Sequence, residues 1–131
     1  MKLHLQRVHL AAAFVVAVGA MFAACGGDDE GPVDGDGTFT GTIHIQDNRF
    51  SPANVTITAG ESVTWRWDGN NSHTVTHGTS PTVPPDAQKL FDTPEQSSGT
   101  FVFKFDNAGT FAYFCRPHFS MGMKGAITVQ P

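Results

Sequence analysis

Cysteine is nearly absent from this chain: only two, Cys25 and Cys115, occur among its 131 residues. Charged residues make up only 15% of the sequence, and eight Lys and Arg against twelve Asp and Glu give a formal net charge of −4. No basic cluster is present, which argues against nucleic acid as a partner. Two cysteines also exclude a framework of several disulfides.

The sequence also lacks an apolar run that would comfortably span a bilayer, for which about 20 residues are needed. The uncharged, mostly apolar stretch 10–24 is shorter, and it follows Lys2 and Arg7. A positively charged N-terminal region, followed by a short apolar stretch that ends in small residues, is typical of a cleaved export signal. We therefore predict a signal peptide over 1–24 and an exported protein, on the periplasmic or cell-surface side.

The segment Ala23-Ala24-Cys25-Gly26 resembles the lipobox of bacterial lipoproteins. That resemblance implies cleavage before Cys25 and acylation of its thiol, which would anchor the protein to a membrane. Phe22 stands where lipoboxes usually have Leu, so ordinary signal-peptidase cleavage after Ala20 stays open as an alternative.

The residues that follow contain little that could be buried. The segment 25–38 consists mainly of Gly and Asp residues, with one Glu. This composition predicts a linker. The folded part is then 39–131, which is enough for one small domain with one core.

Hydrophobic residues in this domain recur with a period of two. Alternating runs occur at 39–45, 55–58, 63–67, 101–105, 111–115 and 127–130, and turn-forming residues separate them, including Ser51-Pro52. Many short strands at such spacing predict an all-β Greek-key sandwich of about seven to eight strands. The long Pro- and Ser-rich connection 78–99 is expected to cross between the two sheets, with a short helical turn within 84–91.

The segment 115–123 (CRPHFSMGM) gathers metal-binding side chains. It supplies the thiolate of Cys115, the imidazole of His118 and the thioethers of Met121 and Met123. A second imidazole is available upstream at His73 or at His77, and the strand period alone does not separate these two. Two His, one Cys and a weak axial Met are the ligands of a blue-copper site.

Several segments of the domain, in this order, resemble the cupredoxins, especially the plastocyanin and pseudoazurin branch. They are Phe50-Ser51-Pro52, 60–65 (GESVTW), His73-Thr74-Val75, 109–115 (GTFAYFC) and Pro117-His118. The resemblance covers about 42–129. It implies one copper ion held by His73, Cys115, His118 and Met123, with Met121 as the axial alternative found in amicyanin.

The same resemblance implies an electron carrier rather than an enzyme. In the family, the ring edge of the ligand at His118 reaches the surface, where redox proteins dock transiently, and we expect a monomer. It also implies that the backbone N–H of Thr74 donates to the Cys115 sulfur and that Asn71 or Ser72 braces the loop. A copper carrier or storage protein without an electron-transfer role is the alternative.

Overall fold

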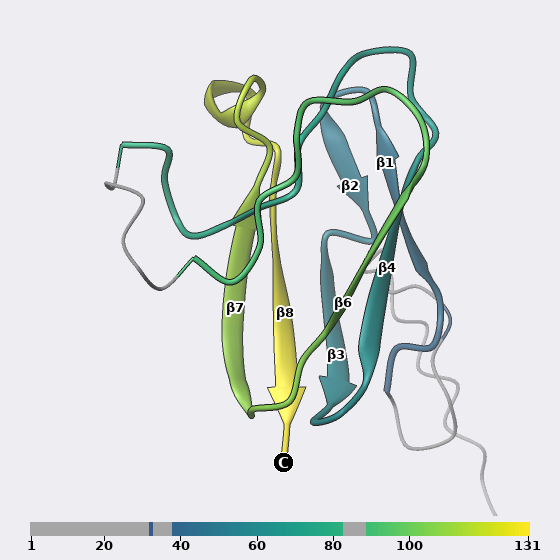
Figure 1. Cartoon of the computed structure of the whole chain (residues 1–131), viewed down its shortest axis with the longest axis vertical. Coiled ribbons are helices and arrows are strands. Elements are labelled where there is room, and N and C mark those ends of the chain that lie inside the picture. Colours follow the sequence, from purple (N-terminus) through teal and green to yellow (C-terminus); the bar gives the residue numbers. More distant parts are fainter. Residues whose placement is uncertain (1–31, 33–37, 83–88) are drawn as a thin grey trace, which may run out of the picture.

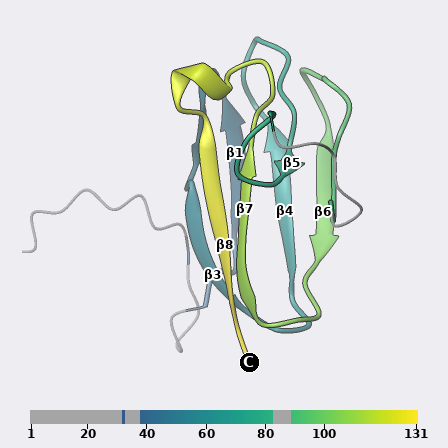
Figure 2. The same cartoon turned by 90° about the vertical axis from the view of Figure 1, so that its left-hand side faces the viewer.

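The computed structural model describes residues 32, 38–82 and 89–131. Within them, two four-stranded sheets lie face to face (Figures 1 and 2). The strands are β1 (Thr42–Gln46), β2 (Arg49–Ser51), β3 (Asn54–Thr58), β4 (Ser62–Trp67), β5 (Thr76–His77), β6 (Thr100–Lys104), β7 (Gly109–Phe114) and β8 (Lys124–Gln130). The predicted signal peptide, Cys25, nearly all of the linker and 84–88 lie outside the described residues.

Each sheet mixes parallel and antiparallel neighbours. The first has the order β2-β1-β4-β6, with β1 and β4 parallel, and the second has the order β3-β8-β7-β5, with β3 and β8 parallel. The chain passes repeatedly from one sheet to the other, and the connection 78–99 runs from β5 in the second to β6 in the first. The predicted Greek-key β-sandwich and the predicted crossover are therefore confirmed.

The core lies between the sheets, because alternate residues of each strand point inward. Ile43 and Ile45 of β1 and Val63 and Trp65 of β4 have no exposed surface. The ring of Trp65 lies 5.6 Å from that of Tyr113 on the opposite sheet. Each such side chain contributes about 1.5–3 kcal/mol by its burial, so this core holds the two sheets in a fixed relation.

Some local details differ from the predictions. Strand β2 was not predicted; it pairs with β1 after a tight turn in which Asn48 adopts a left-handed φ of 66°, and the predicted turn at Ser51-Pro52 separates β2 from β3. Phe39 lies outside β1 and bonds instead to β3, where its N–H donates to the Thr56 carbonyl (2.6 Å). The strand after His73 contains only Thr76 and His77. Short strands of this kind are fixed by their partners rather than by local pattern.

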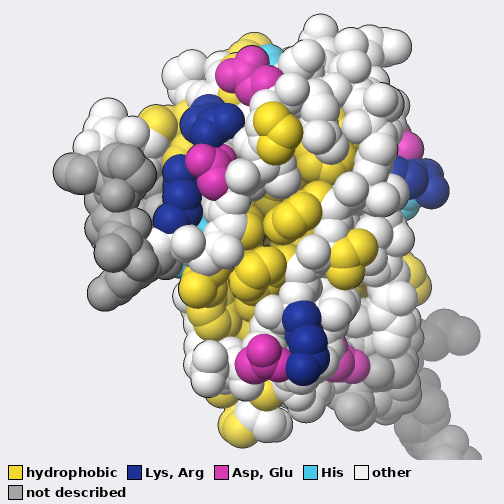
Figure 3. All heavy atoms as spheres, in the orientation of Figure 1, with side chains coloured by type: hydrophobic (Ala, Val, Ile, Leu, Met, Phe, Trp, Pro, Cys, Tyr) yellow, Lys and Arg dark blue, Asp and Glu magenta, His cyan; other side chains and the backbone are white. Residues whose placement is uncertain are grey.

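The face toward the viewer in Figure 3 carries a band of hydrophobic side chains across its middle. Half-buried Phe101 and Phe103 of the edge strand β6 and Phe111 of β7 pack against the core. Phe91, from the crossover, is buried beside them, with its ring 4.9 Å from that of Phe103. The long connection is therefore anchored by an aromatic residue.

No helix in the described ranges is long and apolar enough to cross a membrane.

Candidate metal centre

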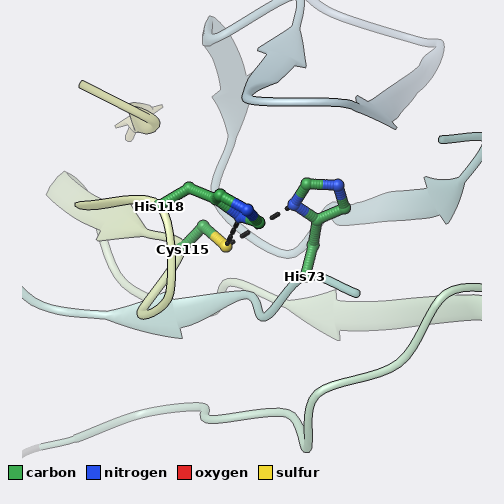
Figure 4. Close-up of side chains that lie close together, drawn as sticks. All are labelled: His73, Cys115 and His118. Carbon is green, nitrogen blue, oxygen red and sulfur yellow. Dashed lines mark hydrogen bonds between the residues drawn. The ribbon is translucent and has the colours of Figure 1, made fainter. Parts of the chain in front are cut away.

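Three side chains from two parts of the sequence lie close together (Figure 4). The Sγ atom of Cys115 lies 3.4 Å from Nδ1 of His118 and 3.7 Å from Nδ1 of His73. One donor atom from each residue falls within 4.8 Å of the others. In the described part of the chain, these residues form the only such group of three. The structure thus brings together three of the four predicted ligands.

The local fold of 115–123 explains why Cys115 and His118 meet. Cys115 directly follows β7, and its N–H donates to the carbonyl of Met123 (3.1 Å) just before β8. The intervening residues form the 3₁₀ turn η1 (Phe119–Met121), whose N-terminal cap is His118. Gly122 has a left-handed φ of 84°, which favours glycine, and it turns the chain back into β8. A closed loop between adjacent antiparallel strands therefore presents these side chains to one point.

His73 is held by a different set of bonds. Its N–H donates to the Gln96 carbonyl (2.9 Å), and the Gln96 N–H donates back to the His73 carbonyl (3.2 Å). The same carbonyl accepts from the buried indole Nε1 of Trp67 (3.1 Å). Since both the crossover and β4 hold its backbone, His73 is fixed without belonging to a strand.

Thr74 ties these two loops together. Its N–H donates to Sγ of Cys115 (3.4 Å), as the family resemblance implied. Its hydroxyl accepts from the backbone N–H of Arg116 (2.9 Å). The Arg116 guanidinium extends the connection, because its Nη1 contacts both carboxylate oxygens of Asp92 at 2.8 and 2.9 Å. Backbone and side-chain bonds together fix the distance between the His73 loop and the Cys115 loop.

The cluster is shielded from water except at His118. His73 and Cys115 have no exposed surface, whereas His118 is half-buried. Burial lowers the pKa of His73 below its ordinary 6.5, and a nearby carboxylate, that of Asp47, offsets this only in part. A neutral imidazole with a free lone pair is the form that binds a metal.

The spacing of the donor atoms fits a single soft metal ion. Ligand bonds of about 2.0–2.3 Å at angles between tetrahedral and trigonal would separate a sulfur and a nitrogen donor by about 3.5–3.8 Å. The two S···N distances of 3.4 and 3.7 Å are close to that range. A thiolate with two imidazoles and a thioether suits copper rather than hard cations.

The two methionines differ in position. Met123 is 1% exposed and lies at the end of the loop, whereas Met121 is 61% exposed. His77 lies apart from the cluster: its ring lies 5.5 Å from that of Phe91, and its Nδ1 accepts from the Leu90 N–H (3.3 Å). His44 is on the outer face of β1, where it pairs with Asp68.

One residue beside the site was not anticipated from the sequence. Asp47 follows β1, where it reads as an ordinary turn residue, yet its carboxylate Oδ1 lies 3.5 Å from Nε2 of His73. The same oxygen accepts the backbone N–H groups of Asn70 and Asn71 at 2.9 and 3.0 Å. The loop brace predicted at Asn71 or Ser72 is thus a bond from the Asn71 backbone to Asp47. Asp47 and His73 are 26 residues apart in the sequence, so only the tertiary structure reveals that Asp47 lies beside the site.

Comparisons with known proteins point to one family. The sequence model described as "Copper binding proteins, plastocyanin/azurin family" matches residues 38–130. A plastocyanin from Scenedesmus fuscus is 41% identical over an alignment of 88 positions, which covers 62% of this chain and 86% of that protein. A halocyanin from Natronomonas pharaonis is 32% identical, covering 62% of this chain and 48% of that protein.

Solved structures agree with the sequence relatives. The chain resembles a purple cupredoxin from Nitrosopumilus maritimus with a TM-score of 0.56 and 25% identity, over 70% of this chain and all of that one. A plastocyanin from the fern Dryopteris crassirhizoma gives the same TM-score at 24% identity, over 69% of this chain and all of that one, and so supports the fold alone.

Proposed function

The chain belongs to the plastocyanin/azurin family of copper-binding proteins, and we propose that it carries single electrons through one mononuclear type 1 copper site outside the cytoplasm. The observation that carries the proposal is the convergence of two imidazole Nδ1 atoms on the buried sulfur of Cys115. When bound, copper supplies a one-electron couple between Cu(II) and Cu(I).

Four residues would hold the ion. His73 and His118 offer imidazole nitrogens, Cys115 offers the thiolate, and Met123 is the weak axial ligand. The burial of Met123 and the exposure of Met121 favour Met123 for this role. The Thr74 N–H donates to the Cys115 sulfur, and a hydrogen bond of this kind would tune the reduction potential of a copper–thiolate site.

Rapid electron transfer requires ligands that move little when the charge of the ion changes. The Thr74 N–H bond to Cys115, the pair of bonds between His73 and Gln96, and the bond from the Cys115 N–H to the Met123 carbonyl restrict such movement. His118 is the one member of the cluster that is not fully buried, so its ring is the route by which an electron reaches the surface. A site without any exposed ligand would suit the storage of copper better than the exchange of electrons with other proteins.

Redox proteins would dock on the surface around His118. Met121 is 61% exposed there and Phe119 is half-buried, so the rim of the site is partly apolar. A small interface of this kind suits brief encounters, and we expect the protein to act as a monomer. His44 and His77 are the remaining histidines of the described chain, which are too few for a second, catalytic copper, so no enzymatic role is proposed.

The N-terminal region would place the domain at a membrane. We assign 1–24 to a lipoprotein-type signal, 25–38 to a linker and 39–131 to the copper domain, with Cys25 carrying the lipid. The test is fatty-acid labelling of cells that make the full chain, with Cys25→Ser as the control. Label and membrane association that survive the substitution would contradict the anchor, and cleavage after Ala20 would replace it.

The electron-transfer proposal is tested on the full chain, purified in detergent and supplied with Cu(II). An intense thiolate-to-copper band in the visible spectrum that bleaches on reduction and returns on oxidation is the expected result. Copper that binds without this band, or that is lost on cycling, would instead support the alternative of a copper carrier or storage protein.

A further inference from the structure

The imidazole of His73 faces two different groups through its two nitrogens. Its Nδ1 lies 3.7 Å from the Cys115 sulfur, and its Nε2 lies 3.5 Å from the carboxylate Oδ1 of Asp47. Nε2 is fully buried and has no hydrogen-bond partner among the described residues at normal distance. A buried ring N–H without an acceptor is costly, so the adjacent carboxylate is the available compensating group.

Asp47 is held in place independently of His73. It stands in the turn after β1, and Oδ1 accepts from the backbone N–H groups of Asn70 and Asn71. The N–H of Asn71 is the main cause that lowers the pKa of Asp47 below its ordinary 3.8. The carboxylate is therefore ionised at neutral pH, and its direction is set by the loop that leads to His73.

We propose that Asp47 is a positioning residue for the metal centre, with its carboxylate fixing the orientation and the Nε2–H tautomer of His73. This inference rests on the proposed function, in which Nδ1 binds copper. A histidine ligand that gives its other ring N–H to a carboxylate is held in one orientation and becomes a stronger donor. A stronger donor, next to a fixed negative charge, stabilises Cu(II) more than Cu(I) and lowers the reduction potential.

The matched pair of variants is Asp47→Asn and Asp106→Asn in the copper-loaded full chain. Each removes one negative charge and keeps the side-chain size. Asp106 is solvent-exposed, pairs with Lys104, and lies in the β6–β7 turn, at the opposite end of the sandwich from η1 (Figure 1). Asparagine at 47 can still accept the Asn70 and Asn71 N–H groups, so the loop should keep its shape.

We expect Asp47→Asn to weaken Cu(II) binding relative to Cu(I) about tenfold. This raises the reduction potential by about 59 mV for a one-electron couple. Asp106→Asn should leave the potential unchanged. Equal potentials in the two variants, with the visible band intact, would overturn the positioning role and leave Asp47 as a loop brace only.

A second measurement needs neither a variant nor copper. Nitrogen-15 NMR of the metal-free wild-type chain reports the tautomer of His73, which should carry its proton on Nε2, next to Asp47. A proton on Nδ1 would overturn the inference. Loss of the visible band in the wild type would defeat the proposed function instead, and the tautomer would still decide the relation between Asp47 and His73.

Discussion

Thr74 holds Cys115 from the neighbouring loop, with its backbone N–H 3.4 Å from the cysteine sulfur. The threonine hydroxyl meanwhile accepts the N–H of Arg116, the next residue after the cysteine. One residue therefore sets both the environment of the sulfur and the path of the chain beyond it. Because the first bond comes from the backbone and the second from the side chain, mutation can separate them.

Thr74→Val should cost about 1–3 kcal/mol of unfolding free energy, because it leaves the part-buried Arg116 N–H without its acceptor. The bond from the Thr74 backbone to Cys115 is retained, so the visible spectrum should change little. Urea unfolding followed by tryptophan fluorescence, beside the spectrum of the copper-loaded protein, checks both. A variant as stable as the wild type would show that the hydroxyl contributes nothing.

Cys115→Ser should abolish the intense visible band, because a serine hydroxyl does not provide the thiolate that gives this absorption. The measurement is the absorption spectrum after Cu(II) is added. Cys25→Ser is the control and should keep the band, since Cys25 precedes the folded domain. A blue Cys115→Ser protein would refute the ligand assignment.

Met123→Gln should lower the reduction potential more than Met121→Gln, because the burial of Met123 favours it as the proposed axial ligand. An amide oxygen favours Cu(II) over the softer Cu(I), and the axial ligand tunes the potential of such sites. A tenfold change in relative affinity corresponds to about 59 mV. The reverse order in redox titrations would give the axial position to Met121.

Gly125→Ala should be strongly destabilising, because a methyl group there would lie 2.2 Å from the Ala53 carbonyl oxygen and 2.4 Å from the Tyr113 ring. The first neighbour is backbone and cannot rotate away, so a cost of about 1–3 kcal/mol or more is expected. Thermal unfolding measures it. Thr128→Ala on the exposed side of β8 is the control, and equal losses would show that the close contact is not the cause.

The metal-free protein should lose stability as the pH falls below about 6.5. Burial lowers the pKa of His73 in the folded state, so the unfolded chain takes up a proton first and is stabilised in acid. Urea unfolding at pH 7.5 and pH 5 measures how the free energy of unfolding depends on pH. His73→Gln should make the dependence shallower, and an unchanged slope would exclude His73 as its origin.

Much of the fold could be predicted because, in a strand with alternating hydrophobic and polar residues, the hydrophobic side chains must point to the core. In β1 and β4, Ile43, Val63 and Trp65 alternate with polar residues and point to the core, as expected. The short strand β2 was missed, because pairing across the turn at Asn48 fixes it rather than its own three residues.

The sequence by itself determined the donor chemistry: one domain cysteine, a histidine three residues later, and methionines beyond it. It also determined the spacing that closes 115–123 into one loop, because these residues are covalent neighbours. Only the tertiary structure decided that His73 and not His77 faces the sulfur, and that Asp47 lies behind it. Those relations join residues 26 to 42 positions apart, and they depend on how two sheets and their loops pack, which no local pattern encodes.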